Sequence, residues 1–505
     1  MFAVLAHVLC VSSLWSQALF PANRATGVNP DVQLRLTFEH KPVIGNAGMI
    51  RVFDAADGRV VDQIDMSIPP GPTTGATGAA LTAGYISAPY PYDNLPKGRT
   101  NANTKPGTPT AGAEPPAAGF QLTIIGGFTD GFHFYPIIVD GNTAILQLHH
   151  NLLQYGKTYY VEMDSSVLQD PGFAGIRGAQ AWRFSTKSAA QAPRADAAKL
   201  IVSTDGSGDF NTVQGAMDFV PDHSARRITV QVKSGIYHEI VYFRNKDNVT
   251  IRGEAPGQVR VTYANSEVFN PHPVNLKTNE VPGTFPSRRA AFTADNANGI
   301  HLVNLILETT VYGQAEGLLI SGSRNILSHV HVIGTGDALQ VNGPTYIVDS
   351  ELTGSGDSIL GRGPAFFERC TLRSNGVFMW IRNTQADHGN VFHNCQFIAT
   401  GPQPTTLARS PKNNASTYPY AEAVLLNAVL TNINPKGWDA ADLGGNVHFW
   451  EFNSRNADGS AVDVSQRVGW SRQLDSSKDA EIIRNYSDPT YVLGGWKPAL
   501  EPGDN

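Results

Sequence analysis

The sequence predicts an all-β protein in which a β-sandwich is followed by a right-handed parallel β-helix with an N-terminal cap helix. Gly (49) and Pro (32) are abundant and charged residues make up only 16% of the chain, a composition typical of turn-rich β proteins. Short apolar segments also recur through the second half of the chain, as the coils of a solenoid do. With 505 residues, the chain is long enough for more than one domain.

The first twenty residues form an apolar run that ends in small and polar residues, MFAVLAHVLCVSSLWSQALF. This pattern is typical of a secretory signal peptide with cleavage near Ala18, although a basic start is missing; a buried N-terminal strand is the alternative. We therefore expect residues 1–20 to be a signal peptide and the protein to be secreted, either extracellular or periplasmic. No other apolar run approaches the roughly 20 residues of a membrane helix, so we expect no membrane span.

Short alternating strands separated by Gly and Asn turns extend over residues 26–187, for example VQLRLTFEH, TAILQLHH and KTYYVEM. Strands at this spacing predict a β-sandwich. Residues 69–119, dominated by Pro, Gly, Thr and Ala, are predicted to be a loop of this domain. Histidines on strand faces are more often packing or surface residues than metal ligands, so we predict no metal site at His133, His149 or His150.

The Ala-rich segment SAAQAPRADAA, residues 188–198, lacks apolar periodicity and is predicted to link this domain to a second one over residues 199–505. The second domain opens with an apolar strand, a Gly-rich turn and an amphipathic helix over residues 212–220. We expect this helix to cap the open edge of the β-helix. Its apolar face contains Val213, Ala216, Met217 and Val220.

The remainder of the second domain repeats a short segment of β-branched and apolar residues. Equivalent starts of these segments are Ile300, Ile326, Tyr346, Phe366, Val391 and Val424. The intervals between them are 26, 20, 20, 25 and 33 residues. A recurring segment with variable spacing is typical of a solenoid whose coils carry loops of different length, with successive strands paired in parallel.

Two aspartates occupy the same position in neighbouring repeats. Asp337 in GTGDAL and Asp357 in GSGDSILG each lie eleven residues after the start of their segments. Stacked strands are about 4.8 Å apart, so the two carboxyl groups should project from one wall at about that separation. Repulsion in a partly dry groove would raise the pKa of one and leave the other ionised, which supplies a general acid and a nucleophile. A lone Asp beside Gly is more often a turn residue, and only its coincidence with other motifs favours catalysis.

Motifs over residues 199–496 resemble, in the same order, those of the pectinesterases, carbohydrate esterases that remove methyl groups from pectin and fold as a parallel β-helix. The motifs are STDGSGDFNTVQGAM, VKSGIYHEIV, GQAEGLLI, GTGDAL, GSGDSILG, VFHNCQF, LARSP, INPKGW, HFWEFNS and RVGWSRQL. This resemblance implies that methylated pectin is the substrate and that no cofactor or metal is required. The first domain resembles the bacterial immunoglobulin-like modules that precede many secreted enzymes.

The resemblance implies roles for four residues. Asp357 would be the nucleophile and Asp337 the general acid and base. Gln314 in GQAEGLLI would donate to the oxyanion. Arg409 in LARSP would hold the nucleophilic carboxylate by a bidentate contact, for which a planar guanidinium is suited.

Three positions depart from the family pattern. Gly336 stands where a second oxyanion glutamine is usual, Ser358 where an aromatic follows the nucleophile, and Pro411 where a tryptophan follows the arginine. Loss of one oxyanion donor costs about 10²-fold or more in rate. Other aromatic residues are candidates to replace the lost sugar-binding platform. They are Trp380, Tyr346 and Tyr418.

Other functions stay open at this stage. Polygalacturonases and pectate lyases are also β-helices, and a carbohydrate-binding or adhesive protein on a degenerate esterase scaffold would show the same departures. The small net charge of −6 gives no reason to expect nucleic acid as a partner, and we expect a monomer. Cys370 and Cys395, 25 residues apart, either stack as buried thiols or form a disulfide.

Overall fold

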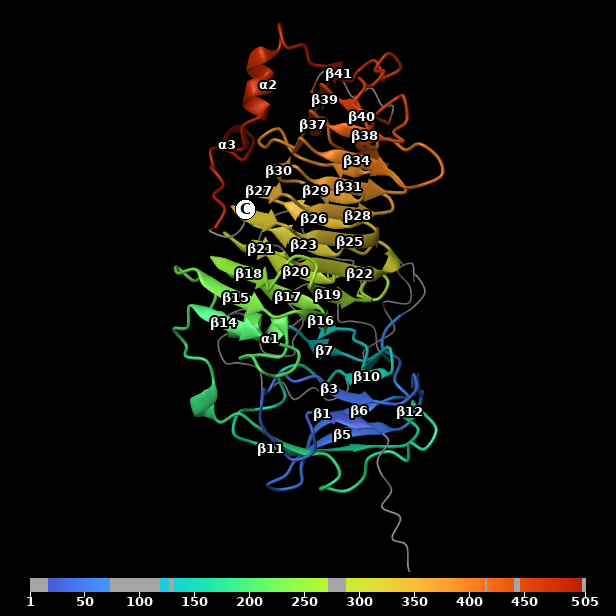
Figure 1. Ribbon diagram of the computed structural model, residues 1–505, viewed down its shortest axis with the longest axis vertical. Coiled ribbons are helices and arrows are strands. Elements are labelled where there is room, and N and C mark those ends of the chain that lie inside the picture. The colour runs from blue at the N-terminus through green and yellow to red at the C-terminus, as the bar shows by residue number, and fades with distance from the viewer. Residues whose placement is uncertain are drawn as a thin grey trace, which may run out of the picture. The chain divides into compact units, whose positions relative to one another are not determined.

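The structure is a computed structural model that describes residues 17–72, 119–126, 131–270, 288–413, 416–439 and 446–501 (Figure 1). The chain divides into two compact units, one formed by residues 1–69 and 135–190 and the other by residues 70–134 and 191–505. Most of the predicted signal peptide and of the predicted loop after residue 69 lies outside the described residues. No helix in the described ranges is long and apolar enough to cross a membrane.

The first unit contains two main sheets that share one hydrophobic core, as expected for a β-sandwich. One sheet has the order β1 (Ala18–Phe20), β3 (Leu34–Thr37), β10 (Thr143–Leu146) and β9 (Ile137–Asp140). The other has the order β2 (Ala25–Val28), β13 (Arg183–Thr186), β11 (Thr158–Met163), β5 (Met49–Asp54) and β6 (Val60–Asp65). A small pair is formed by β4 (Val43–Ile44) and β12 (Leu168–Gln169), and a 3-10 turn η2 (Ala189–Gln191) follows the sandwich.

The second unit is the predicted parallel β-helix, whose stacked coils run from β14 to β41 in Figure 1. Most of its described strands form three parallel sheets. Sheet 1 contains β14 (Lys199–Val202), β15 (Ile228–Val232), β18 (Val249–Gly253), β21 (His301–Val303), β24 (Asn325–Ser328), β27 (Thr345–Val348), β30 (Ala365–Glu368), β33 (Asn390–His393), β37 (Glu422–Leu426), β39 (His448–Phe452) and β41 (Arg472–Gln473). Sheet 2 contains β16 (Gly235–His238), β19 (Val259–Tyr263), β22 (Ile306–Gly313), β25 (His331–Gly336), β28 (Glu351–Gly354), β31 (Thr371–Ser374), β34 (Gln396–Ala399), β38 (Val429–Thr431) and β40 (Arg455–Asn456). Sheet 3 contains β17 (Val241–Arg244), β20 (Phe292–Asp295), β23 (Leu318–Ser321), β26 (Leu339–Asn342), β29 (Ile359–Gly361) and β32 (Met379–Ile381).

The predicted strand register is confirmed for all but the first repeat. Four successive pairings join the predicted starts in sheet 1: Ile326 with Tyr346, Tyr346 with Phe366, Phe366 with Val391, and Val391 with Val424. The first start was wrong by one residue, because Ile326 pairs with His301. All three residues of β21 are buried, as is the preceding Ile300. The apolar pattern therefore did not show which of these residues pairs with Ile326.

The predicted cap helix is confirmed as α1 (Val213–Phe219), which contacts the first strands of sheets 1 and 3. Thr212 is the N-cap, and its hydroxyl accepts from the Gly215 N–H at 3.0 Å. The Glu239 carboxylate accepts from two further free N–H groups of the first turn. All four residues of the predicted apolar face are fully buried in the core of the β-helix.

Residues 70–134, part of the predicted loop and strands of the first domain, belong to the second unit. The short strands β7 (Thr123–Ile124) and β8 (Gly131–Phe132) pair there, and the Phe132 ring packs on Tyr242 with centroids 4.8 Å apart. His133 is buried, and its backbone N–H donates to Asn270 Oδ1 at 2.7 Å. These buried contacts hold the described residues around β8 in the second unit. The hydrophobic periodicity of the sequence does not reveal them.

The two cysteines are free and buried. The Cys370 N–H donates to Cys395 Sγ at 3.3 Å, and burial raises the pKa of the Cys395 thiol. The spacing of the two cysteines allowed either stacked buried thiols or a disulfide, and the structure has stacked thiols.

Two short helices, α2 (Ala480–Tyr486) and α3 (Pro489–Val492), cover apolar side chains of sheet 1 near the C-terminal coils (Figure 1). A small hairpin, β35 (Lys412–Asn413) with β36 (Ser416–Thr417), projects from the loop before β37. Glu422, on β37, is buried beneath the helices. Its carboxylate accepts from Tyr486 on α2 at 2.6 Å and from His388 and His448, both at 2.8 Å.

Replacing Glu422 by glutamine should lower the free energy of unfolding by about 3 kcal/mol at pH 7, as expected when one partner of a buried ion pair is removed. Burial favours the neutral acid, but the bonds from His388, His448 and Tyr486 prevail and lower the pKa of Glu422 to about 2. The ionised form therefore stabilises the fold above the ordinary carboxyl pKa, and this contribution is lost as pH falls towards 2. Denaturant unfolding at pH 7 and pH 3 should show the wild-type advantage shrinking at the lower pH. An advantage that grows at pH 3 would contradict this role.

Candidate active site

Asp337 and Asp357 hold equivalent positions on neighbouring coils, as predicted. Each lies in the turn from sheet 2 to sheet 3, two residues before a paired position: Leu339 of β26 pairs with Ile359 of β29. The Ala338 and Leu339 N–H groups both donate to the carbonyl of Ser358, at 3.1 and 2.9 Å. Backbone hydrogen bonds therefore hold the two turns together, and both carboxyl groups belong to one wall of the β-helix.

Asp357 has one occupied and one unoccupied carboxylate oxygen. Arg409 Nη1 donates to Oδ2, whereas Oδ1 is buried and has no hydrogen-bond partner among the described residues. Burial raises the pKa of Asp357, and the charge and hydrogen bond of Arg409 oppose this rise. The contact has one hydrogen bond where the sequence predicted a bidentate pair. The Arg409 guanidinium also lies 4.7 Å from the centroid of the Trp380 ring, and this stacking restricts its orientation.

Asp337 has a different environment. Its side chain is largely buried, and Arg289 Nη2 donates to Oδ2 at a long 3.4 Å. Burial, followed by the charge of Glu316, raises the pKa of Asp337 to about 8, and the charge of Asp357 acts in the same direction. The charges of Arg289 and Arg382 oppose the rise. The neighbouring aspartates therefore differ in their electrostatic surroundings although they are chemically identical.

Glu316 is a third acid in the same stack, and neither the repeat spacing nor a motif indicated it. Leu318 of β23 pairs with Leu339 of β26, so Glu316 and Asp337 each lie two residues before a paired position. Glu316 is fully buried, and Arg289 Nε donates to both of its carboxylate oxygens at 3.0 and 2.8 Å. Counting from the start of the repeat failed here for two reasons: β22 contains a register shift between Glu308 and Tyr312, and the turn between Gly313 and Leu318 is longer than the corresponding turn of the next coil. Counting back from the apolar strand that follows each turn would have found it.

Gln314 lies on the coil next to Asp337, because the preceding residues Gly313 and Gly336 pair across sheet 2. Its backbone carbonyl accepts from the Glu267 N–H at 2.8 Å, and its side chain is exposed. The structure thus brings Gln314 to the coil that precedes the two aspartates, with its amide group open to solvent.

The structure explains two of the three positions at which the sequence departs from the family pattern, Gly336 and Ser358. A Cβ atom on Gly336 would lie 2.0 Å from the carbonyl oxygen of Gly313, so this backbone leaves no space for a glutamine side chain. Ser358 is buried, and its hydroxyl is 2.9 Å from that of Ser374. An aromatic residue at position 358 would have to displace this buried contact. Close packing therefore maintains both small residues beside the acids.

An aromatic and basic cluster lies on the coil that follows Asp357. Trp380 of β32 pairs with Leu360 of β29, and its ring meets Tyr418 edge to face with centroids 5.8 Å apart. The Arg382 guanidinium lies 4.8 Å from the centroid of the Trp380 ring. Arg382 Nε is buried without a hydrogen-bond partner in the described part of the chain. The positive charge of Arg382 acts on both aspartates and lowers the pKa of each.

The structure therefore brings Asp337, Asp357 and Arg409 together with two of the three aromatic candidates, Trp380 and Tyr418. The third, Tyr346, lies on β27 in sheet 1, where its ring stacks on Phe366 with centroids 6.0 Å apart. The structure adds Glu316, Arg289 and Arg382, which the sequence did not indicate. Arg382 was missed because a lone Arg after an apolar strand is an ordinary surface pattern, and only the fold places it beside the acids.

The family model described as pectinesterase matches residues 199–495 of the chain. Two relatives from Arabidopsis thaliana are similar in sequence. A probable pectinesterase/pectinesterase inhibitor is 28% identical over 291 residues, which cover 54% of this chain and 52% of the relative. A probable pectinesterase is 27% identical over 317 residues, which cover 59% and 60% of the two chains. The chain thus spans about half of the length of the first relative and three fifths of the second.

Solved structures of two pectin methylesterases also match. The enzyme from carrot is 19% identical with a TM-score of 0.47, and the match covers 59% of this chain and 93% of that one. The enzyme from Erwinia chrysanthemi is 21% identical with a TM-score of 0.46, and the match covers 61% and 100% of the two chains.

Proposed function

The chain belongs to the pectinesterase family, and we propose that it is a carboxylic ester hydrolase that removes methyl groups from methylated polygalacturonate. Asp357 acts as the nucleophile and Asp337 as the general acid and base. One observation carries the proposal: two stacked aspartates lie in opposite environments. Asp357 contacts the cation Arg409 and keeps one oxygen without a hydrogen bond, whereas Asp337 is buried beside the anion Glu316.

In the first half of the reaction, Asp357 Oδ1 forms a bond to the ester carbonyl carbon, and the carbonyl oxygen takes up the negative charge. When this intermediate collapses, the bond to the methoxy oxygen breaks. The departing oxygen takes the proton of Asp337 and leaves as methanol. The products of this half are an acyl-enzyme on Asp357 and an ionised Asp337.

In the second half, Asp337 accepts a proton from water while the water oxygen attacks the acyl carbon. The bond to Asp357 breaks, which restores the nucleophile and releases the uronate carboxylic acid. Asp337 is again protonated at the end of the cycle. The pKa of about 8 suits this double role, because a catalytic group is most effective when its pKa is near the working pH.

Arg382 is proposed to supply the oxyanion stabilisation that no side chain at Gly336 can supply. Three features support this role: its charge acts on both aspartates, its Nε lacks a partner in the described structure, and it stacks on Trp380. Gln314 is the second proposed donor. Trp380 and Tyr418 are proposed to contact the sugar rings through their apolar faces.

Replacing Arg382 by alanine should lower kcat by about 10²- to 10³-fold, the usual cost of losing one oxyanion donor. Arg382→Lys should recover part of that loss, because the charge is retained and the planar group is not. Steady-state kinetics on methylated pectin measures both variants. Arg484→Ala, which removes an exposed arginine of α2, is the matched control. A rise in KM with unchanged kcat would reassign Arg382 to binding of the substrate, and unchanged kinetics would remove it from the site.

One digest of methylated pectin tests the reaction class, with methanol, reducing ends and unsaturated products measured in parallel. We expect methanol alone. New reducing ends would indicate a polygalacturonase, and unsaturated products a pectate lyase. Gly336 and the exposed amide of Gln314 favour one second candidate, a carbohydrate-binding or adhesive protein on an esterase scaffold. Binding of pectin without release of methanol would support that candidate. Secretion and a monomeric state stay predictions.

A further inference from the structure

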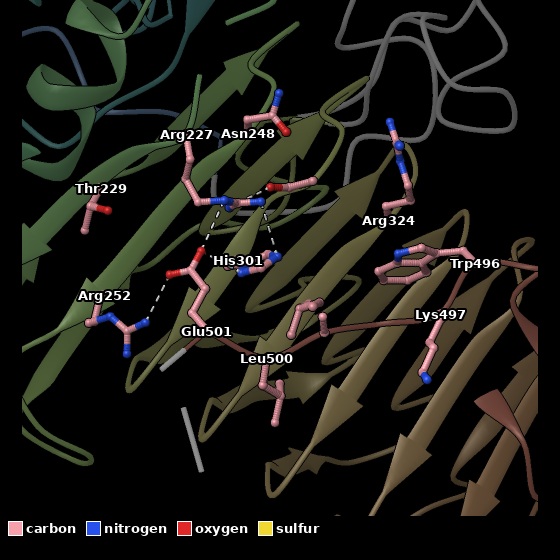
Figure 2. A pocket seen from close by; sticks show the side chains of 13 residues that line it. Arg227, Thr229, Asn248, Arg252, His301, Arg324, Trp496, Lys497, Leu500 and Glu501 are labelled. Carbon is pink, nitrogen blue, oxygen red and sulfur yellow. Dashed lines mark hydrogen bonds and ion pairs between the residues drawn. The ribbon is translucent and has the colours of Figure 1, made fainter. Parts of the chain in front are cut away.

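Residues 496–501 cross strands β15, β18, β21 and β24 on the outer face of sheet 1 (Figure 2). The segment and the strands enclose a cavity of about 670 Å³. Besides His301, the lining side chains include four basic ones and one acidic one. They are Arg227, Arg252, Arg324, Lys497 and Glu501.

One part of the cavity already binds a carboxylate. The Glu501 side chain accepts a hydrogen bond from Thr250 Oγ1 at 2.7 Å. It also forms ion pairs with Arg227 Nε at 3.1 Å, with Arg252 Nη2 at 3.3 Å and with His301 Nδ1 at 3.1 Å. Burial favours neutral Glu501, but these partners prevail and lower its pKa. This end of the cavity is therefore filled by the chain's own acid.

The other end of the cavity has cations and an aromatic ring. Arg324 and Lys497 are exposed, and neither forms a hydrogen bond or ion pair with a described residue. Figure 2 shows the Trp496 indole between these two side chains. Trp496 is half-buried against the apolar cluster that contains Phe366, which fixes the position of its ring. An aromatic face flanked by two unpaired cations suits a ring-shaped ligand that carries a carboxylate.

We propose that this cavity is a second binding site for polygalacturonate, with a sugar ring on Trp496 and carboxylates of bound uronate residues at Arg324 on one side of the indole and at Lys497 on the other. The inference rests on the proposed function, which supplies such residues as its product. The cavity lies on sheet 1, whereas the two aspartates lie in the turns between sheets 2 and 3. The site would therefore hold demethylated polysaccharide while another stretch of substrate reacts.

The proposed site distinguishes product from substrate. A uronate carboxylate is an anion that forms charge-assisted hydrogen bonds with either cation, whereas its methyl ester is neutral and accepts much weaker ones. We therefore expect trigalacturonate to bind at this site at least tenfold more tightly than its trimethyl ester. Since both cations are exposed, binding should weaken as the salt concentration rises.

Isothermal titration of the full chain with trigalacturonate tests the proposal. The wild-type protein should show two sites, and the double variant Arg324→Ala/Lys497→Ala should lose one of them or bind there at least tenfold more weakly. Because both side chains are exposed and form no hydrogen bond or ion pair with described residues, the variant should fold and release methanol at the wild-type rate. Lys478→Ala/Arg484→Ala removes two exposed cations elsewhere and should retain both sites.

Unchanged binding in the Arg324→Ala/Lys497→Ala variant would overturn the proposal. So would displacement of trigalacturonate from this site by inorganic phosphate at equal concentration, because that result would indicate a general anion site. Maltotriose, which has similar rings and no carboxylate, should not compete. If the esterase proposal fails and the cavity proposal holds, no methanol is released, and Arg324→Ala/Lys497→Ala still removes binding. If only the cavity proposal fails, methanol is released and the double variant binds as the wild type does.

Discussion

Replacing Asp357 by asparagine should lower kcat for methanol release by about 10⁵-fold, the scale of losing a catalytic nucleophile. The amide has the shape of the carboxylate, but its oxygen carries no full charge and does not form the acyl-enzyme. Asn also tolerates the left-handed backbone at this position, where φ is 46°, so the turn should be retained. Initial rates of methanol release, with circular dichroism to check folding, measure the effect.

Asp349 provides a matched control. It has the same left-handed backbone, with φ of 47°, and its carboxylate is also paired with an arginine, Arg369. It differs in lying at the end of β27 in sheet 1, away from the turns that carry the acids. Asp349→Asn should therefore keep nearly full activity. Turnover by Asp357→Asn above about a hundredth of the wild-type rate would exclude Asp357 as the nucleophile.

The pair of acids could be predicted from the sequence because the repeat itself encodes their alignment. The segments that begin at Ile326 and Tyr346 have equal length, so an equal offset places Asp337 and Asp357 on adjacent coils. Glu316 belongs to the same stack, yet the register shift in β22 changes its offset from the start of the repeat. Simple counting therefore works only where a coil has no bulge or insertion.

The basic side chains of the site show a different limit of sequence reasoning. Arg409 was found because the motif LARSP resembles a family motif, whereas Arg289 and Arg382 lie in no such motif. Their roles depend on where their long, flexible side chains extend from one coil to the next. The spacing of residues in the sequence does not determine this direction. The same limit applies to Glu501, whose four partners come from two strands of sheet 1, β18 and β21, and from Arg227, the residue just before β15. Periodicity predicts which backbones stack, and the structure is needed to show which side chains meet.

The profile of kcat/KM against pH should fall above about pH 8, because Asp337 must be protonated to release methanol and its pKa is about 8. The groups that set this pKa besides burial are Glu316 and Asp357, which raise it, and Arg289 and Arg382, which lower it. Replacing Glu316 by glutamine removes a negative charge and frees Arg289 to pair with Asp337. Both changes favour ionised Asp337, so the alkaline limb should move to lower pH.

This shift separates an electrostatic role of Glu316 from a purely structural one. A variant that is merely less stable loses rate at every pH, whereas the loss in Glu316→Gln should be largest near pH 8 and small at pH 5, where Asp337 stays protonated. Asp337→Asn cannot ionise and should abolish the limb together with most of the activity. Glu422→Gln alters a buried acid elsewhere and should leave the limb in place. If the alkaline limb of Glu316→Gln lies at the wild-type pH, the charge of Glu316 does not contribute to the raised pKa of Asp337. Glu316 and Arg289 would then only stabilise the turn that carries Asp337.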